Sequence, residues 1–419
     1  MKWNKLFLLT TLWMIALVAV AQRTEVTGVV VNAQTGDRLP QVSVCVADGG
    51  SGQREAVVTN DDGQFTLKSD QVIRAITVSH VGYSTQRITL NESSNDTASR
   101  QRQLTVRLQP AAIQLRDITV WTGNPRELVS LAISKIPDNY SHESELSGCF
   151  YRETAMKRQH YVYVAEGVVD MYKTPYSHST NRDRVAIRKG RRLMSPRRGD
   201  TLTVKVTGGP VQPVSLDIVK NLDLLLNDEE LRHYDFQMLT PQNIGDRLQY
   251  VVAIAPSPYS LSDFALYHGR LYIDQQTLAF SRVELELDMT DRDKATRMML
   301  VRKPLGLRFK PRELSLVVDY DYDGAVSRMS YVRTRFRFNC DWKRRLLATS
   351  FTATCELVVT ERQGSPARQP IAGRESFDSR DAFYDKVDYF RDPDFWRDYN
   401  IIEPTESLEK AVGKLLKRI

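Results

Sequence analysis

The stretch Glu25–Leu90 decides the fold of the first part of the chain. It begins with the alternating run VTGVVV at 26–31, followed by the turn QTGDRLP at 34–40 and a second apolar run, VSVCV, at 42–46. The segment TNDDGQF at 59–65 and the run ITVSHVGY at 76–83 complete it. Short strands separated by Pro and Asp-Gly turns are typical of a small antiparallel sandwich. We therefore predict a β-sandwich over residues 22–110, closed by the alternating segment Leu104–Leu108.

The same stretch resembles the carboxypeptidase-regulatory-like domain. The matching positions include the pairs Thr35–Gly36 and Leu39–Pro40 of the first turn, Asp62–Gly63 of the second, and the triplet Val81–Tyr83. The resemblance implies a transthyretin-like β-sandwich of seven strands. It implies no particular activity, because in this family the domain accompanies peptidases, outer-membrane receptors and many envelope proteins.

Length and composition predict a globular protein of two or three domains. The chain has 419 residues, of which 42% are hydrophobic and 26% charged. The formal charge of +7 is spread over many segments. The densest basic stretch, Arg188–Arg198, lacks the interleaved aromatic residues that stack on bases. We therefore predict no nucleic-acid partner.

Residues 1–21 have the pattern of a secretory signal peptide. Lys2 and Lys5 accompany the apolar run Leu6–Val20, and the segment Ala19–Ala21 offers small residues for cleavage. The alternative is an uncleaved anchor, but the run is short for a bilayer span of about 20 residues. We expect an exported protein, periplasmic or associated with the outer membrane, with no transmembrane segment after signal removal.

The four cysteines are Cys45, Cys149, Cys340 and Cys355. Export would permit disulfides, but Cys45 and Cys355 lie on the apolar faces of alternating segments, where buried thiols are common. A hairpin turning near Trp342–Lys343 would also not place Cys340 opposite Cys355. We predict no obligatory disulfide.

Residues 111–144 are predicted to connect the sandwich to a second domain. Leu115–Val120 alternates and predicts a short strand. A helix is predicted to begin at Asn124, which suits the N-cap, with Pro125 in the first position. Its apolar face would carry Leu128, Leu131, Ala132 and Ile136, and Pro137 would end it. We expect this helix to form the hinge between the domains.

Residues 145–362 predict a large curved antiparallel sheet, so the fold class is mainly β. Apolar and polar residues alternate over 283–289, 314–318, 332–338 and 351–359. One helix is predicted near Ser215–Leu226, with Ile218, Leu222 and Leu225 at helical spacing. Such an order favours a half-barrel-like sheet that wraps a helix.

Two further resemblances concern this second part of the chain. The segment Gly269–Thr277, followed by Val283, is similar to one hairpin of periplasmic lipoprotein carriers and related lipid-binding half-barrels. The segments GCFYRE at 148–153 and FWRDYNIIEP at 395–404 resemble the body of uncharacterised exported proteins of Bacteroidetes-type bacteria. Neither resemblance implies a known reaction.

Residues 363–419 predict an aromatic tail followed by an amphipathic helix. Eight aromatic residues lie among acidic ones between Phe377 and Tyr399. They suit either a platform for sugars or a tail folded over the open edge or mouth of the sheet, and we favour the tail. A helix is predicted after Thr405, with an apolar stripe opposite three lysines. It suits either a membrane surface or its own domain, and we favour packing on the domain.

A zinc site must be considered because the N-terminal domain often accompanies zinc carboxypeptidases. Those enzymes use His-x-x-Glu and a distant His, which His142, Glu145 and His268 match in spacing. In that family, however, an α/β catalytic domain precedes the sandwich, whereas here a β-rich segment follows it. The polar segment around His142 is also typical of an exposed loop. We therefore predict no catalytic residues, no metal and no cofactor.

Three other patterns carry less weight. The segment Asp319–Gly324 matches the start of a calcium loop, but Ser330 replaces the glutamate at the twelfth position, so we predict a hairpin turn. Arg198–Asp200 spells an adhesion tripeptide that short basic loops often contain by chance. The remaining histidines are isolated in the sequence and predict no general base: His80, His160, His178 and His233.

These observations predict a non-enzymatic protein of the cell envelope. The sandwich would serve as a docking or spacer module, and the curved sheet would bind an apolar, lipid-like ligand or an envelope protein partner. Two alternatives stay open. One is a zinc-dependent, carboxypeptidase-like hydrolase built on His142, Glu145 and His268, and the other is a structural surface or adhesion module.

Overall fold

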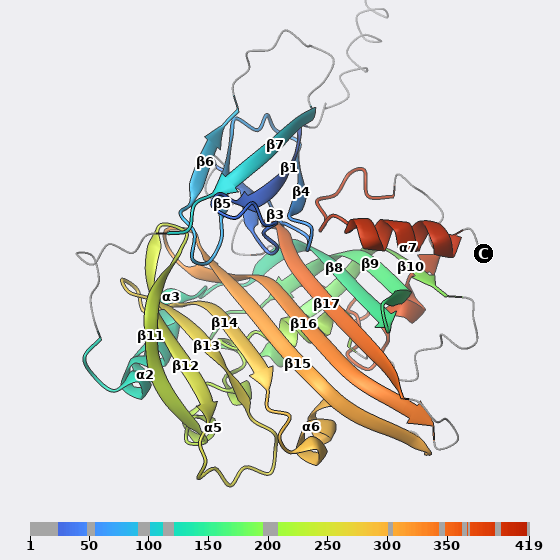
Figure 1. The fold of residues 1–419 in the computed structure, drawn as a ribbon. Helices are drawn as coiled ribbons and strands as arrows, with labels where there is room; N and C mark the ends of the chain where they lie inside the picture. Colours follow the sequence, from blue (N-terminus) through green and yellow to red (C-terminus); the bar gives the residue numbers. More distant parts are fainter. Residues whose placement is uncertain are drawn as a thin grey trace, which may run out of the picture.

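The computed structural model describes residues 24–416 except for 48–54, 91–100, 112–120, 196–207, 301–304, 343–347, 363–366, 368 and 390–394. The predicted signal peptide, the predicted strand Leu115–Val120 and the tripeptide Arg198–Asp200 lie outside the described residues. The described chain forms two small sheets and one large, curved sheet (Figure 1). This confirms the predicted mainly β fold class. No helix in the described part is long and apolar enough to cross a membrane.

The first domain is a sandwich, and seven strands of it are described. One sheet has the order β4-β1-β7 and the other the order β3-β2-β5-β6. β1 pairs antiparallel with β4 and parallel with β7. The strands are β1 (Thr24–Asn32), β2 (Ser43–Val46), β3 (Ala56–Val58), β4 (Gln64–Ser69), β5 (Ala75–Ser79), β6 (Gln86–Thr89) and β7 (Gln101–Leu108).

Gly63 explains why the second turn of the sandwich carries an Asp-Gly pair. Its φ is +70°, and a Cβ there would lie 2.7 Å from the carbonyl oxygen of Val30. Only glycine combines that backbone conformation with such a close approach. The turn brings Phe65 and Leu67 of β4 into the buried core beside Val30.

The second domain is an antiparallel sheet of eleven described strands in the order β11-β12-β13-β14-β15-β16-β17-β8-β9-β10-β18. Only β18, at one edge, joins in parallel. The strands are β8 (Glu145–Lys157), β9 (His160–Lys173), β10 (Arg184–Met194), β11 (Tyr234–Ile244), β12 (Arg247–Pro256), β13 (Tyr267–Asp274), β14 (Phe280–Leu287), β15 (Leu307–Tyr322), β16 (Ser327–Trp342), β17 (Thr349–Arg362) and β18 (Asp388–Tyr389).

β16 shows how the period of two builds this sheet. Val332, Phe336 and Phe338 belong to hydrophobic clusters on the concave face. Arg333, Arg335 and Arg337 alternate with them and lie on the convex face, where Arg333 and Arg337 pair with acidic side chains. Alternation of this kind gives a sheet with one apolar face, and Figure 1 shows that this sheet is strongly curved.

The helix α2 (Pro125–Ser134) begins as predicted, because the Asn124 side chain accepts a 2.9 Å hydrogen bond from the backbone N–H of Arg126. Its buried face differs from the prediction: Val129 is buried, whereas Leu131 is 39% exposed. Pro137 does not simply end this helix but lies in the first turn of a second one, α3 (Ile136–Asn139). Both helices contribute to the core of the large sheet rather than forming a free hinge.

The predicted helix over Ser215–Leu226 is wrong. The segment 211–231, which we call the filling segment, consists of α4 (Val211–Ser215), the 3₁₀ turn η4 (Leu222–Leu224) and α5 (Asp228–Leu231). The Asn221 amide donates a 2.9 Å hydrogen bond to the carbonyl of Ser215, and Asp217 is fully buried among polar partners. Such side-chain bonds compete with helical ones. Ile218 and Leu225 are nevertheless buried, as their spacing indicated.

The aromatic tail covers an edge of the large sheet, as favoured from the sequence. After the 3₁₀ turn η5 (Phe383–Lys386), β18 pairs with Arg191 and Arg192 of β10. The C-terminal helix α7 (Glu406–Leu416) contacts β9 and β10, and the Thr405 hydroxyl accepts a 3.2 Å hydrogen bond from the N–H of Leu408. α7 therefore packs on its own domain. The remaining elements are η2 (Thr180–Arg182) and α6 (Arg292–Met299).

The sandwich sits firmly at one end of the large sheet, which we call the sandwich end (top of Figure 1). Val58 of β3 packs with Phe150 and Trp396 in a cluster on the convex face. Arg333 pairs with Asp61 at 3.1 Å. The backbone N–H of Gly82 donates a 2.8 Å hydrogen bond to a carbonyl of β11. These contacts fix the two domains against each other.

Candidate functional site

The concave face of the large sheet is the candidate binding surface. The chain itself covers much of this face with α2, α3, the filling segment and two aromatic residues of the tail, Phe377 and Phe383, and the α5 part of the filling segment reaches the end away from the sandwich (Figure 1). Their apolar side chains pack on every strand from β8 to β17. This part of the concave face is therefore an ordinary filled core.

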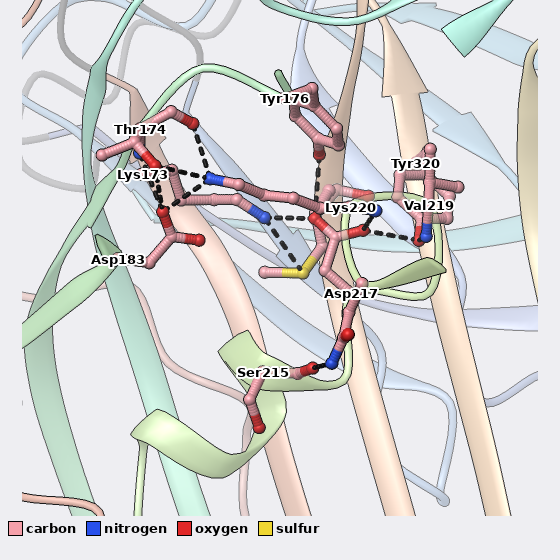
Figure 2. A network of polar contacts seen from close by, with 12 residues as sticks. Lys173, Thr174, Tyr176, Asp183, Ser215, Asp217, Val219, Lys220 and Tyr320 are labelled. Atoms are coloured by element: carbon pink, nitrogen blue, oxygen red, sulfur yellow. Dashed lines mark hydrogen bonds and ion pairs between the residues drawn. The ribbon is translucent and has the colours of Figure 1, made fainter. Parts of the chain in front are cut away.

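A buried network of charged side chains attaches the filling segment to the sheet (Figure 2). Asp217 accepts hydrogen bonds from the hydroxyls of Tyr320 at 2.8 Å and Tyr176 at 3.0 Å, and it forms an ion pair with Lys173. Beside it, Lys220 pairs with Asp183 at 2.6 Å and donates to the carbonyl of Thr174 at the same distance. Lys173 lies on β9 and Tyr320 on β15, and Asp183 directly precedes β10, so the network joins the filling segment to two strands and to the start of a third.

The charges of this network compensate one another. Burial alone would raise the pKa of Asp217, but the Lys173 ammonium and the two tyrosine hydroxyls outweigh burial and lower that pKa. Burial and the nearby Lys173 lower the pKa of Lys220, while Asp183 opposes the shift. Oδ2 of Asp183 is the one buried atom among these charged groups without a hydrogen-bond partner, and buried charges that are paired in this way favour one position of a segment. We interpret the network as an anchor rather than as a reactive site.

Glu153 is a second polar group on the concave face, and the sequence analysis did not select it. It lies on β8 between Tyr151 and Ala155, which point the same way. Its carboxyl accepts hydrogen bonds from Tyr151 at 2.7 Å and from Tyr163. Burial raises the pKa of Glu153 to about 8, although the Tyr151 hydroxyl acts against that shift. The side chain is therefore mostly neutral at pH 7. An acid at an inward position of an alternating strand was the signal that could have found it.

The far end of the concave face, away from the sandwich, carries a different cluster, which we call the mouth cluster. Phe338 lies directly opposite Phe351 on the neighbouring strand, with ring centroids 5.6 Å apart, and Phe309 lies 5.0 Å from Phe338. Met299 and Leu300, at the end of α6, pack against the cluster from the other side. The members of the mouth cluster are Leu307, Phe309, Phe338, Cys340 and Phe351.

Polar contacts to one loop hold α6 in place. Asp291 caps its first turn by accepting hydrogen bonds from two backbone N–H groups at 3.0 Å. The Lys294 ammonium donates to the carbonyl of Ser262 at 2.7 Å, and Arg297 donates to the carbonyl of Asp263 at 3.1 Å. Among the described residues, the hydrophobic side chains that pack on the mouth cluster from outside are those of Met299 and Leu300, whereas several elements fill the rest of the concave face.

The structure does not bring His142, Glu145 and His268 together. His142 is exposed in the turn before β8, and Glu145 begins β8 and pairs with Arg328 at 2.5 Å. His268 is exposed on β13, opposite Glu286. Four strands lie between β13 and β8, a separation of about 20 Å or more at the usual strand spacing. Within the described ranges, no group of three His, Cys, Asp or Glu residues could hold a metal ion.

The other sequence patterns also have definite places. Asp323 and Gly324 form the turn between β15 and β16, with φ of Gly324 at +99° and the Asp323 carboxylate accepting from two backbone N–H groups. The calcium-like segment is thus a hairpin, as predicted. All four cysteines are buried free thiols, and Cys340 lies opposite Thr349 rather than Cys355.

A small cleft lies between the sandwich and the large sheet. Its lining includes His80 of the sandwich and Arg282, Asp319 and Tyr331 of the sheet, and it encloses about 60 Å³. That volume holds only a few water molecules. Burial and the nearby Arg282 lower the pKa of His80 to about 4, so this histidine is neutral at pH 7. We therefore regard the cleft as part of the interface between the domains.

Several solved structures are similar to this chain at low identity. A DUF1329 family protein from Desulfovibrio piger is 11% identical, with a TM-score of 0.23, over 57% of this chain and 94% of that chain. A LolA superfamily protein from Nitrosomonas europaea is 12% identical, with a TM-score of 0.19, over 61% and 99%. A putative membrane-associated protein of unknown function from Bacteroides fragilis is 10% identical, with a TM-score of 0.17, over 82% and 99%. Scores this low support no argument about function.

No curated protein matches the chain. The first domain, however, matches a known family of domains, and this match agrees with its sequence and its two-sheet architecture. Residues 26–120 match the model of the CarboxypepD_reg-like domain, which confirms the resemblance inferred from the turns and strands of this segment.

Proposed function

We propose that this chain is a non-enzymatic binding protein of the cell envelope. The large curved sheet would bind an apolar, lipid-like ligand at the mouth cluster. The sandwich would hold the sheet in place by docking to another envelope component. The predicted signal peptide at residues 1–21 supports an envelope location.

One observation carries the proposal: the concave apolar face continues beyond the filling segment. On β16 the same face extends from Val332 in the filled core to Phe338 in the mouth cluster. On the antiparallel neighbour β17 it extends from Leu357 in the filled core to Phe351 in the mouth cluster. There the described hydrophobic residues that pack over it are Met299 and Leu300, at the end of one short helix. Methionine adapts its shape readily, so a cover of this kind can yield to an apolar guest.

Cys340 offers a site-specific test, because it is the one cysteine of the mouth cluster. The Cys340 residue is 5% exposed, and Cys45 in the sandwich is a matched control at 6%. The rate at which a maleimide modifies each thiol is followed by peptide mass spectrometry, with and without oleate or lysophosphatidylglycerol. We expect the lipids to slow modification of Cys340 severalfold and to leave Cys45 unchanged. Equal rates for Cys340 with and without saturating lipid would contradict the proposal.

A scaffold without a ligand is the second candidate function. It is favoured by the filled part of the concave face, where Asp217 attaches the chain's own filling segment to β9 and β15. The cysteine experiment separates the two functions, because a scaffold gives no protection of Cys340 by either lipid. The zinc hydrolase receives no support from the positions of His142, Glu145 and His268.

A further inference from the structure

Exposed apolar side chains gather at the far end of the large sheet. Among the described residues, eight large hydrophobic side chains are exposed, and five of them lie around α6: Tyr259 (91%), Leu261 (93%), Phe264 (63%), Met298 (40%) and Leu305 (99%). Single exposed apolar residues need no explanation, but such a group on neighbouring loops marks an interaction surface. We call these five residues the apolar rim.

The loops that carry the apolar rim are tied to each other. Tyr259, Leu261 and Phe264 belong to the loop between β12 and β13, which receives hydrogen bonds from Lys294 and Arg297 of α6. Leu305 follows α6 and precedes β15. Figure 1 shows α6 and this loop at the bottom of the molecule, at the opposite end from the sandwich. The apolar rim therefore projects from one end of the molecule, beside the mouth cluster.

Basic side chains lie next to one side of the apolar rim. Arg308, Lys310 and Arg312 are exposed at the beginning of β15, directly after Leu305. Acidic side chains flank the other side, where Asp228 and Glu229 of α5 precede His233, whose ring bonds to Ser260 of the loop. Three cationic side chains thus follow Leu305 closely in the chain, although Arg308 also pairs with Asp341 at 3.9 Å and Asp263 lies within the rim loop.

We propose that the apolar rim inserts into the surface of a membrane that contains anionic lipids, with Leu305 at the deepest point. Apolar side chains beside Lys and Arg are the combination that binds such surfaces, because burial of the former adds to attraction of the latter by lipid phosphates. The inference goes beyond the proposed function and does not rest on it. If both hold, the mouth cluster faces the membrane from which an apolar ligand would come.

Vesicle binding tests the proposal. The exported protein is mixed with vesicles of phosphatidylcholine alone or of phosphatidylcholine with phosphatidylglycerol as the anionic lipid, and bound protein is measured by flotation. We expect binding to the mixed vesicles that weakens as salt rises. The double variant Leu261→Ser, Leu305→Ser should bind about tenfold more weakly to them. Val72→Ser is the matched control, since Val72 is 57% exposed on the sandwich, and it should bind like the parent protein.

A charge variant separates the two contributions. Arg308→Gln, Lys310→Gln should lose about tenfold in binding to anionic vesicles and little to neutral ones. Because all four substituted side chains are exposed, thermal unfolding should be unchanged in both variants. Equal binding of parent and rim variant to vesicles would overturn the proposal. A second result would also overturn it: the parent protein binds no vesicles but forms a concentration-dependent dimer that the rim variant does not form. The apolar rim would then contact a second copy of the chain.

The outcome is independent of the proposed function. Protection of Cys340 by a soluble lipid can be measured on the rim variant itself. Protection without vesicle binding would refute the membrane surface alone, and vesicle binding without protection would refute the ligand site alone.

Discussion

The Tyr320 hydroxyl of β15 donates a 2.8 Å hydrogen bond to Asp217 of the filling segment, although 103 positions separate the two residues. The same carboxylate pairs with Lys173 of β9. One buried acid thus connects two distant strands to the irregular segment that fills part of the concave face. This connection fixes the filling segment against β9 and β15.

Removal of the Asp217 carboxylate should destabilise the protein strongly. Asp217→Ala leaves Lys173 buried without its partner, which costs about 3–5 kcal/mol in the free energy of unfolding. Urea unfolding followed by tryptophan fluorescence measures it. The double variant Lys173→Met, Asp217→Leu should recover part of the loss, because no charge then stays unpaired.

The control for Asp217 is the exposed pair Lys135–Asp138, whose atoms lie 2.9 Å apart. Asp138→Ala should change the unfolding free energy by less than about 1 kcal/mol. If Asp217→Ala cost no more than Asp138→Ala, the network would not be the anchor inferred from its geometry.

Glu153 should make stability fall as pH rises. Its pKa is raised from 4.5 to about 8 by burial, so between these values the folded state holds a proton that the unfolded state releases. His80, whose pKa is lowered to about 4 by burial and Arg282, gives the opposite slope, but its contribution is complete above about pH 6.5. Burial also raises the pKa of Glu403 and of Asp319, so the contribution of Glu153 is isolated by comparing the parent protein with a Glu153 variant from about pH 6.5 to 8.

Glu153→Gln stays neutral, so its unfolding free energy should lack the decline of about 2 kcal/mol expected across that window for the parent protein. Chemical unfolding at several pH values measures both proteins. Parallel profiles for the variant and the parent would mean that Glu153 does not bind a proton in the folded state.

Gly269 should tolerate no side chain. A Cβ at this position of β13 would lie 1.9 Å from the carbonyl oxygen of Glu284 on β14. Gly269→Ala must push the two strands apart, and we expect a loss of about 3 kcal/mol or more in the free energy of unfolding. Gly413→Ala in α7 is the control, since no atom lies within 4 Å of a Cβ there, and it should be neutral or stabilising by up to about 1 kcal/mol. Similar melting temperatures for the two variants would contradict the strand pairing.

Trp396 should hold the tail and the two domains together. Its indole N–H donates a 3.0 Å hydrogen bond to Glu166, and its ring packs edge-on against Phe150 at 5.5 Å. Trp396→Ala should cost about 3–5 kcal/mol and expose the tail to limited proteolysis. Tyr389→Ala, in the same tail but 40% exposed, should leave the cleavage pattern unchanged. Equal cleavage of the two variants would show that Trp396 is not the attachment point.

Local pattern was sufficient to predict most of the architecture. Alternation of apolar and polar residues identifies strands such as β16, because every second side chain points into the same apolar core. The Asp62–Gly63 turn is predictable because it needs a backbone conformation that glycine favours. The path of the filling segment could not be predicted in this way. Its helical spacing at Ile218 and Leu225 is real, but Asp217 is held by partners 44 and 103 positions away, which no local window contains.

At the candidate site, too, local sequence pattern predicted some features, whereas others depend on residues distant in the chain. The sequence indicated an apolar concave face but not where the chain would cover it, because covering depends on tertiary packing of α6 and the filling segment. Glu153 could have been noticed as an acid on the inward side of β8. The exposure of Leu261 and Leu305 could not be noticed in this way, since the exposure of an apolar loop residue depends on the tertiary packing around the loop. His142 and His268 match a metal pattern in spacing alone, and the sheet order places them far apart.

The central claim is that the mouth cluster binds an apolar ligand, and analysis of what the protein carries tests it most directly. The protein is isolated without detergent from the cells that export it, weighed by native mass spectrometry, and then extracted with organic solvent. We predict a bound lipid-like molecule, near one per chain, whose removal speeds maleimide modification of Cys340 but not of Cys45. A protein that has the mass of the bare chain, yields no lipid on extraction and shows no protection of Cys340 by added lipid would contradict the claim.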